Sequence, residues 1–370
     1  MKILFTYEFS FKKYGFGGGQ VIALNFMNSL TRMGHSVSIC CAGSDDDFFS
    51  KKSNYKFYFN NKKPNVFSSI QSAFHSIRII KKIKPDLVCS FTGEAFAISY
   101  FCNKNDINFC TYIASPTLPY FSFKNPILSI KNIRYSLSHF FQYIGVLQSK
   151  KNYSISEYTY KQLIDNWGVS EETIENLGCG VSDNFLKNNT NSPNRVIDIC
   201  SVGRIEYFQK PINIAAKALY KSESWNKWVV IGSGSDEKKL KKLIRELGYY
   251  NKVEFFSSME NNEVQNILSN TKISLLLSNH ESFFITAYEA IASNNILIVS
   301  DVAQIKEDFS EFPTVFILDN NSEKKIIELL DHILNNYYEL YEKTGMAKEY
   351  IISKYSWNKI SKKLIDPFLN

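Results

Sequence analysis

The chain has 370 residues, 44% of them apolar, and this length favours two domains with separate cores. The formal net charge of +7 is spread along the sequence without a dense basic run or zinc-finger spacing, which argues against nucleic-acid binding. No run of about 18 apolar residues predicts a membrane span, and the seven irregularly spaced cysteines favour reduced thiols in a cytoplasmic protein.

The first half of the chain alternates between short apolar runs and helical patterns. Gln20–Met33 and Ile70–Ile83 carry apolar residues at the spacing of amphipathic helices. Four apolar runs predict strands: Lys2–Tyr7, Ser36–Ala42, Pro85–Ser90 and Asn108–Ala114. Because strands and helices alternate, we expect a parallel sheet with right-handed crossovers.

A glycine-rich turn, Gly15-Phe-Gly-Gly-Gly19, separates the first strand from the first helix. Glycines here let the backbone approach a phosphate or a sugar, although a merely flexible turn has the same composition. The spacing differs from the Gly-x-Gly-x-x-Gly dinucleotide fingerprint, and no acid ends the second strand. A nicotinamide-dependent dehydrogenase is therefore disfavoured.

The segment Tyr120–Gln148 mixes seven aromatic residues with Lys124, Lys131 and Arg134. One interpretation is a helix pair packed on the first sheet. The other is an exposed amphipathic face that contacts an anionic membrane or a lipid-linked acceptor.

The alternating pattern restarts after a polar linker at residues 187–194. Asp236–Leu247 predicts a surface helix, with apolar residues on one side. Six apolar runs predict strands: Val196–Val202, Trp228–Ile231, Lys252–Phe256, Ile273–Leu277, Ile296–Ser300 and Val315–Leu318. We therefore expect an α/β protein with two Rossmann-like domains.

The domain boundaries follow from the linker and the tail. Residues 1–184 form the expected first domain, and residues 185–354 the second. The tail has a helical pattern and no strand, so a C-terminal helix at about residues 355–370 is expected to pack back on the first domain.

Two cations follow the first strand of the second half. Gly203-Arg204 comes directly after Val196–Val202, and Lys210 follows six residues later. Open parallel sheets bind ligands at the carboxyl ends of their strands, where an Arg and a Lys could hold a diphosphate. The alternative is that these two cations are ordinary solvated side chains on the protein surface. Gly232-Ser-Gly234 ends the next strand and is either a phosphate-binding turn or a plain one.

Two carboxylates flank a later helix start. Glu281 precedes the helix and Glu289 lies inside it, which would separate them by about 12 Å in a continuous helix. The free N–H groups at the helix start would face any charge between them. This layout suits a ligand with two polyol ends and a central charge, such as a sugar nucleotide.

No metal site is evident. The five histidines lack Cys, Asp or Glu partners at metal-ligand spacing, and no Ser/His/Asp or Cys/His set is recognisable. His280 is adjacent to Glu281 and is a candidate hydrogen-bonding residue only.

These motifs together resemble glycosyltransferase family 4, which has the GT-B architecture. The resemblance covers nearly the whole chain and rests on these segments: Met1-Lys-Ile-Leu, Gly18-Gly-Gln, Arg32-Met-Gly-His, Ser154-Ile-Ser-Glu, Asn176–Asp183, Val202-Gly-Arg, Lys210, Val230–Gly234, Val253-Glu-Phe-Phe, Glu281–Glu289 with Ser300-Asp301, and Tyr355-Ser-Trp.

The resemblance implies two parallel sheets facing across a cleft and a retaining, metal-independent enzyme. It implies no cofactor, because a nucleotide-diphosphate sugar is the donor substrate. The implied roles are as follows: Arg204 and Lys210 hold the diphosphate, Glu281 the donor sugar and Glu289 the ribose, while Gly203, Gly232 and the amides of Phe283, Phe284 and Ile285 line the donor, and Gly18 and Gly19 cover its phosphates. The expected catalytic residues are Arg204, Lys210 and Glu281.

The sequence departs from the family pattern at several points. A histidine common in the family is replaced by Ala114, and the usual glycine after the lysine is replaced by Pro211. Asn294-Asn295 and Val302-Ala303 stand where the family often has Gly-containing turns. These departures affect how the acceptor hydroxyl would lose its proton and other details of catalysis.

The expected reaction moves a hexose-type sugar to a hydroxyl of a glycan or lipid-linked acceptor in cell-surface glycan biosynthesis. It is expected in the cytoplasm, with peripheral contact at the inner face of an anionic membrane, and without nucleic acid as a partner. Two alternatives stay open: another GT-B enzyme, such as a sugar-nucleotide epimerase or a phosphorylase, and a degenerate, non-catalytic partner subunit.

Overall fold

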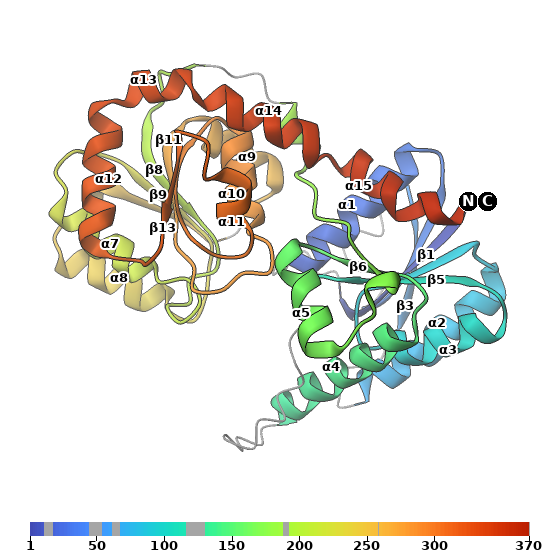
Figure 1. Ribbon diagram of the computed structural model, residues 1–370. Coiled ribbons are helices and arrows are strands. Elements are labelled where there is room, and N and C mark those ends of the chain that lie inside the picture. The colour runs from blue at the N-terminus through green and yellow to red at the C-terminus, as the bar shows by residue number, and fades with distance from the viewer. Residues whose placement is uncertain are drawn as a thin grey trace. The chain divides into compact units, whose positions relative to one another are not determined.

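The computed structural model describes residues 1–10, 18–43, 54–60, 67–115, 130–187, 192–257 and 259–369, without the side chains of 130–136 (Figure 1). The chain forms two compact units. Unit 1 comprises Met1–Gly180 and Trp357–Asn370, and unit 2 comprises Val181–Ser356. Each unit contains one parallel sheet covered by helices.

Unit 1 is built on a seven-stranded sheet with the order β3-β2-β1-β4-β5-β6-β7. The paired strands run parallel to one another. Their bounds are β1 Lys2–Ser10, β2 Ser36–Ala42, β3 Lys56–Asn60, β4 Leu87–Ser90, β5 Asn108–Ile113, β6 Asn152–Ser154 and β7 Ile174–Asn176. Chain order reverses between the neighbouring strands β1 and β4, so the carboxyl ends of these two strands border the crevice where such sheets bind ligands.

Helices cover both faces of this sheet because successive residues of a buried strand point to opposite sides. Leu4 packs with α2 and α3 on one face, whereas the ring of Phe5 lies 6.3 Å from that of Phe26 in α1 on the other. The helices of the unit are α1 Gly18–Arg32, α2 Ser68–Ile83, α3 Ala95–Lys104, α4 Ile130–Gln148, α5 Glu157–Trp167 and α15 Trp357–Ile365.

Unit 2 repeats the plan with six parallel strands in the order β10-β9-β8-β11-β12-β13. Their bounds are β8 Ile197–Val202, β9 Trp228–Ile231, β10 Val253–Phe256, β11 Thr271–Leu276, β12 Ile296–Ser300 and β13 Val315–Leu318. The helices are α6 Asp183–Leu186, α7 Ile212–Lys221, α8 Glu237–Glu246, α9 Asn261–Ser269, α10 Ile285–Ala292, α11 Ile305–Phe309, α12 Glu323–Asn335, α13 Tyr337–Glu342 and α14 Thr344–Lys354. Here chain order reverses between β8 and β11.

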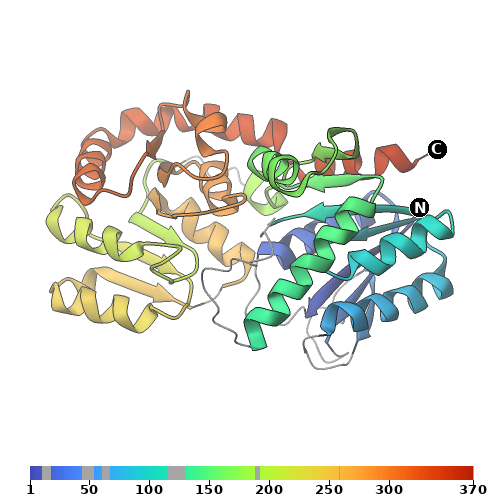
Figure 2. The same cartoon turned by 60° about the horizontal axis from the view of Figure 1, so that its bottom comes forward.

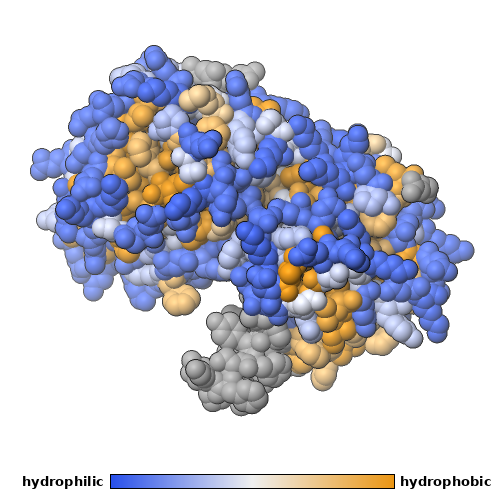
Figure 3. All heavy atoms as spheres, viewed as in Figure 1, coloured by the Kyte–Doolittle hydropathy of each residue, from blue (hydrophilic) through white to orange (hydrophobic). Residues whose placement is uncertain are grey.

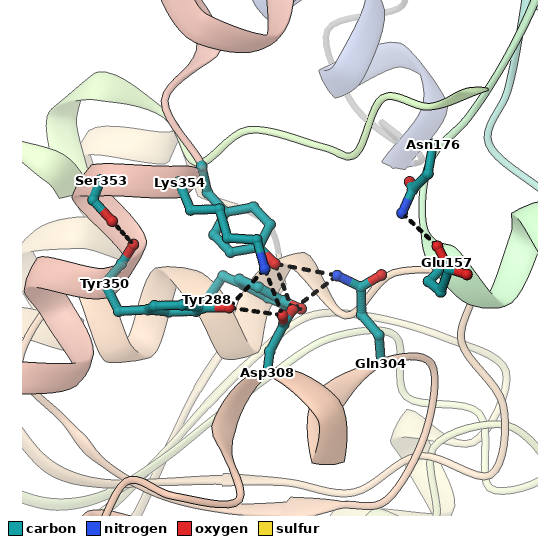
Figure 4. A network of polar contacts seen from close by, with 9 residues as sticks. Glu157, Asn176, Tyr288, Gln304, Asp308, Tyr350, Ser353 and Lys354 are labelled. Atoms are coloured by element: carbon teal, nitrogen blue, oxygen red, sulfur yellow. Dashed lines mark hydrogen bonds and ion pairs between the residues drawn. The ribbon is translucent and has the colours of Figure 1, made fainter.

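A polar cluster around Asp308 of α11 fastens α14 to unit 2 (Figure 4). The Asp308 carboxylate accepts hydrogen bonds from the hydroxyls of Tyr288, Tyr350 and Tyr355 at 2.5–3.0 Å. Lys354 forms an ion pair with it at 3.2 Å. Burial opposes ionisation, but the hydrogen bonds outweigh it and lower the pKa of Asp308. The cluster therefore fixes the end of α14, after which the chain returns to unit 1.

The predicted strands of both halves are confirmed to within a few residues, as are the helices at Ile70–Ile83 and Asp236–Leu247. Three short strands, β3, β6 and β7, were not predicted. The prediction that Gly18 and Gly19 belong to a turn is wrong, because α1 begins at Gly18. The rest of that turn, residues 15–17, lies outside the described residues.

The segment Tyr120–Gln148 is described only from residue 130 onward, where it forms the single helix α4. Residues 120–129 lie outside the described residues, so the expected helix pair is untested. In the part of the chain that the structure describes, no helix is both long enough and apolar enough to cross a bilayer.

Candidate functional site

The candidate site lies at the carboxyl edge of the unit 2 sheet, where chain order reverses between β8 and β11. The loop after β8 carries Gly203, Arg204 and Lys210, and the loop after β11 carries Glu281. The structure brings two of these side chains together: the Lys210 ammonium group forms an ion pair with Glu281 Oε1.

Gly232 and Gly234 let the loops after β8 and β9 pack backbone to backbone. A Cβ atom on Gly232 would lie 1.8 Å from the Gly203 carbonyl oxygen, and one on Gly234 would lie 2.2 Å from the Ile205 oxygen. Gly203 N–H donates to Ile231 at 2.9 Å, and Ile205 N–H donates to Ser233 at 3.0 Å. Neither Gly232 nor Gly234 can therefore be replaced without moving backbone, which supplies a structural reason for this motif.

Lys210 lies in a confined position. Its Nζ is 4.0 Å from the centre of the Phe284 ring, and its side chain is only 15% exposed. Burial lowers the pKa of Lys210, and the nearby charge of Arg204 lowers it further, while Glu281 raises it. The pair thus places one cation and one anion, both shielded from water, at the sheet edge.

Hydrogen bonds hold the two loops against each other. Asn279 N–H donates to the Gln209 carbonyl at 2.8 Å, and the Asn279 side chain donates to the Phe208 carbonyl at 2.7 Å. Ser278 Oγ donates to Glu281 Oε1 at 2.9 Å. The Glu281 carboxylate is therefore oriented by Ser278 as well as by Lys210.

Two further side chains stabilise this edge. Ser278 N–H donates to Ser300 Oγ at 2.9 Å, and Ser300 Oγ donates to Asn321 at 2.6 Å. The Asn321 amide in turn contacts Asn279 at 3.2 Å. Sequence reasoning missed Ser278 and Asn321. Their positions could have indicated them, since Ser278 follows the carboxyl end of β11 and Asn321 follows that of β13.

Glu289 is the most unusual group of the site. It lies in α10 with 6% of its surface exposed, and no hydrogen-bonding partner for its carboxylate occurs among the described residues. Burial raises the pKa of Glu289 to about 8. A buried carboxylate without a partner is costly, so the site favours a ligand that donates hydrogen bonds to it.

The segment that follows Glu281 is not helical, and α10 begins only at Ile285. Glu281 therefore precedes the helix, as predicted. The Ile285 N–H group already donates to the Phe283 carbonyl at 3.1 Å. The Phe283 and Phe284 side chains are buried, and the Phe283 ring stacks on Tyr288 at 4.3 Å.

Arg204 lies at the same edge but points into solvent. Its side chain is 56% exposed and meets Glu206 at 3.4 Å. In unit 1, Gly18 has open space around its missing Cβ, and Gly19 packs against the Tyr7 hydroxyl. These glycines follow β1, at the reversal point of their own sheet.

Sequence reasoning also missed two buried carboxyl groups at that point of unit 1. Glu8 lies near the carboxyl end of β1, and Ser69 and Ser138 donate to its carboxylate at 2.6 and 2.7 Å. Glu94 follows β4, and Thr92 Oγ1 donates to it at 2.5 Å. Burial, together with the charge of Glu8, raises the pKa of Glu94 to about 7. In the sequence, Glu8 and Glu94 follow the two predicted strands Lys2–Tyr7 and Pro85–Ser90. This pattern could have identified both carboxyl groups.

Other candidate groups stay isolated. Ala114 follows β5, so the expected histidine position holds no base. No group of three or more His, Cys, Asp or Glu side chains suited to a metal ion occurs within the described ranges. The cysteines are buried and unpaired by disulfides.

Two family models match consecutive parts of the chain. Residues 16–185 match a model described as Glycosyltransferase Family 4, and residues 182–350 match Glycosyl transferases group 1. An uncharacterized glycosyltransferase of Haemophilus influenzae is 23% identical over 93% of this chain and 97% of its own length. One of Methanocaldococcus jannaschii is 28% identical over 46% of this chain. The match spans less than half, 44%, of that relative.

Solved structures share the fold over the full chain. A glycosyltransferase from Rickettsia africae gives a TM-score of 0.77 at 18% identity, covering 99% of this chain and 97% of that one. The lipopolysaccharide outer core galactosyltransferase WaaB gives 0.69 at 18% identity, with 100% and 99% covered. Anabaena HepE, solved with UDP-glucose, gives 0.76 at 13% identity, with 99% of both chains covered. The chain belongs to the family 4, group 1 glycosyltransferases of GT-B architecture.

Proposed function

We propose that this chain transfers a hexose-type sugar from a nucleotide-diphosphate sugar to a hydroxyl acceptor, with retention of anomeric configuration. The observation that carries the proposal is Glu289, a buried carboxylate without a described partner, in the helix α10 that follows the loop bearing the Lys210–Glu281 ion pair. Two ribose hydroxyls would supply the missing hydrogen bonds. The solved relative HepE binds UDP and UDP-glucose, which supports a uridine nucleotide as the first candidate.

The expected chemistry is electrostatic. Arg204 and Lys210 would neutralise the diphosphate as the bond between its oxygen and the anomeric carbon breaks. Glu281, which Ser278 and Lys210 hold in place, would accept hydrogen bonds from hydroxyl groups of the donor sugar. No metal is required in this scheme, because the two side-chain cations carry the compensating charge.

The acceptor hydroxyl must lose its proton as its oxygen bonds to the anomeric carbon. Position 114 is alanine, so a donor phosphate oxygen is the proposed proton acceptor. The products are the glycosylated acceptor and a protonated nucleoside diphosphate. Because water can replace the acceptor, slow donor hydrolysis is expected when acceptor is absent.

The proposed acceptor is a cell-surface glycan or its lipid-linked precursor, made on the cytoplasmic side of a membrane. This proposal is supported by WaaB, and by WaaG, a structural neighbour described as involved in lipopolysaccharide biosynthesis.

A thermal-shift screen against UDP, GDP, ADP, CMP and dTDP without metal tests the donor site. A nucleotide at about 100 times its Kd should stabilise the protein by about 2.7 kcal/mol. We expect one nucleotide to act, and its effect to disappear in Glu289→Ala and Arg204→Ala. No shift with any nucleotide would contradict the proposal and favour a non-catalytic subunit.

Product analysis separates the remaining alternative. A sugar-nucleotide epimerase or a phosphorylase would use the same donor-binding groups. An epimerase releases an altered sugar without transfer, and a phosphorylase requires inorganic phosphate as a substrate. Transfer of the intact sugar to an added acceptor, without dependence on phosphate, supports the glycosyltransferase.

A further inference from the structure

Three helices of unit 1, α2, α3 and α4, lie side by side on one face of its sheet (Figure 2). None of the three contains an aspartate or a glutamate. Together they contain six basic residues: Arg78, Lys81, Lys82, Lys104, Lys131 and Arg134. This layer of helices therefore carries charge of one sign.

The basic side chains that the structure describes on these helices have no acidic partner there. Arg78, Lys81 and Lys82 of α2 and Lys104 of α3 are exposed and form no ion pair with a described residue. The Lys81 ammonium group lies 5.4 Å from the centre of the Phe101 ring of α3. By contrast, the exposed helix α8 of unit 2 pairs Lys241 with Glu237 and Lys242 with Glu246.

Large aromatic side chains are exposed between these cations. Phe67, Phe74 and Tyr100 are 60%, 64% and 62% exposed, and Phe140 of α4 is also exposed. Phe74 and Lys81 are seven residues apart and share one side of α2, and Phe67 lies at the N-terminal end of this helix as its N-cap. Figure 3 shows apolar side chains gathered at the surface of unit 1 near α4.

The aromatic and basic residues are fixed to a common layer. The rings of Phe96 in α3 and Phe141 in α4 stack at 4.4 Å. The Gln148 side chain at the end of α4 accepts from Ser99 of α3 at 2.9 Å. Because α3 packs on both neighbours, exposed groups of the three helices are displayed by one rigid surface.

We propose that this surface, defined by Phe67, Phe74, Arg78, Lys81, Lys82, Tyr100 and Lys104, docks on an anionic lipid bilayer. Aromatic side chains favour the membrane–water interface, which borders the hydrocarbon core on one side and water on the other. Cations without an acidic partner are attracted to anionic lipid headgroups. The three helices contain no acid, so repulsion that would oppose contact is limited to their ends, where Asp86 and Asp106 are exposed. This inference refines the proposed lipid-linked acceptor by naming the surface that brings unit 1 to the membrane.

Vesicle flotation of the full chain tests the proposal. Vesicles of phosphatidylcholine alone are compared with vesicles that also contain phosphatidylglycerol. We expect binding to the anionic vesicles only, and weaker binding as salt is raised, because salt screens exposed charges. Each cation near an anionic surface contributes about five-fold in affinity. Lys81→Glu with Lys82→Glu should therefore weaken binding by at least about 25-fold, because the variant loses two attractive charges and adds two repulsive ones.

Matched variants in unit 2 serve as controls. Lys238→Glu with Lys239→Glu makes the same change in net charge on α8 and should leave binding within about two-fold. Phe74→Ser with Tyr100→Ser should weaken binding, whereas Tyr220→Ser with Tyr338→Ser, at similarly exposed positions, should not.

Three results would overturn the proposal: no flotation with either vesicle, equal binding to neutral vesicles, or equal losses in the control variants. Capture of a protein partner by this surface without vesicle binding would overturn it as well. The nucleotide screen reports on the donor site separately. A surface variant that loses vesicle binding should keep its nucleotide shift, so failure of either proposal is recognised independently.

Discussion

Among single residues, Glu289 combines burial with a lack of described hydrogen-bonding partners, and this couples stability to pH. The pKa of Glu289 is raised to about 8, so the folded chain holds its proton more tightly than the unfolded chain does. The corresponding stabilisation is present in full below the unfolded pKa of about 4.5 and is lost as the pH rises through 8. At high pH the buried negative charge opposes folding.

Glu289→Gln removes this ionisable group while nearly preserving its shape. We expect the variant to gain stability over the wild type as the pH rises from 5 to 9, by at most about 5 kcal/mol, because one pKa unit corresponds to about 1.4 kcal/mol. Urea unfolding at both pH values measures the gain. The same variant should lose the nucleotide shift. A stability difference that does not change with pH would mean that Glu289 is ionised throughout.

At the scale of elements, the packing of the two glycine-containing loops after β8 and β9 explains how the site residues are positioned. The missing Cβ of Gly232 lets its loop rest directly on Gly203, and this contact positions the start of the segment that leads to Lys210. Gly232 also has a φ of 143°, which side chains rarely adopt. Two independent obstacles therefore oppose a side chain here.

Gly232→Ala should destabilise unit 2 by about 2–4 kcal/mol, since backbone must move to relieve the clash. It should also abolish the nucleotide shift. Gly248→Ala is the matched control: Gly248 has a φ of 83°, but no atom lies within 4 Å of the added Cβ. The control should cost about 1 kcal/mol from backbone strain alone and keep nucleotide binding. Equal costs for the two variants would show that strain, rather than loop packing, explains Gly232.

The sequence predicted long, strongly apolar strands and missed short ones for a physical reason. β6 and β7 have three residues each, too few for a hydrophobic pattern to repeat. Their pairing comes from neighbours in the sheet. Likewise, the helix start at Gly18 runs against the low helix propensity of glycine, and the pattern therefore favoured a turn.

The candidate site, like the fold, could be predicted from the sequence only in part. Motif and position indicated Lys210, Glu281 and Glu289, because strand ends converge in a parallel sheet. The ion pair between Lys210 and Glu281 and the isolation of the Glu289 carboxylate depend on three-dimensional packing, which no linear pattern contains. Ser278 and Asn321 are common polar residues, and only their contacts identify them as supports of the site.

At the scale of the whole molecule, the chain passes between its units twice, and the two passages are held together. Val181 N–H donates to the Tyr355 carbonyl at 2.8 Å, next to a bridge between Val181 and Ser356. The returning helix α15 then completes unit 1. The ring centroids of Trp357 and Phe26 are 4.9 Å apart. Trp357 also packs directly on Gly180, where an added Cβ atom would lie only 2.6 Å from its ring. Unit 1 thus depends on residues more than 170 positions away from the rest of its core.

This dependence predicts that Trp357→Ala weakens unit 1 alone. Loss of a buried tryptophan costs about 3–5 kcal/mol, and the cavity would open beside α1. Hydrogen exchange should therefore accelerate in α1 and β6 while β8 and β11 keep their protection, because each unit has its own core. Tyr338→Ala, an exposed aromatic of α13, is the control and should change stability by less than about 0.5 kcal/mol. If exchange rose equally in both units, the two cores would have to unfold as one cooperative block, and the tail would stabilise the entire molecule rather than the unit it packs on.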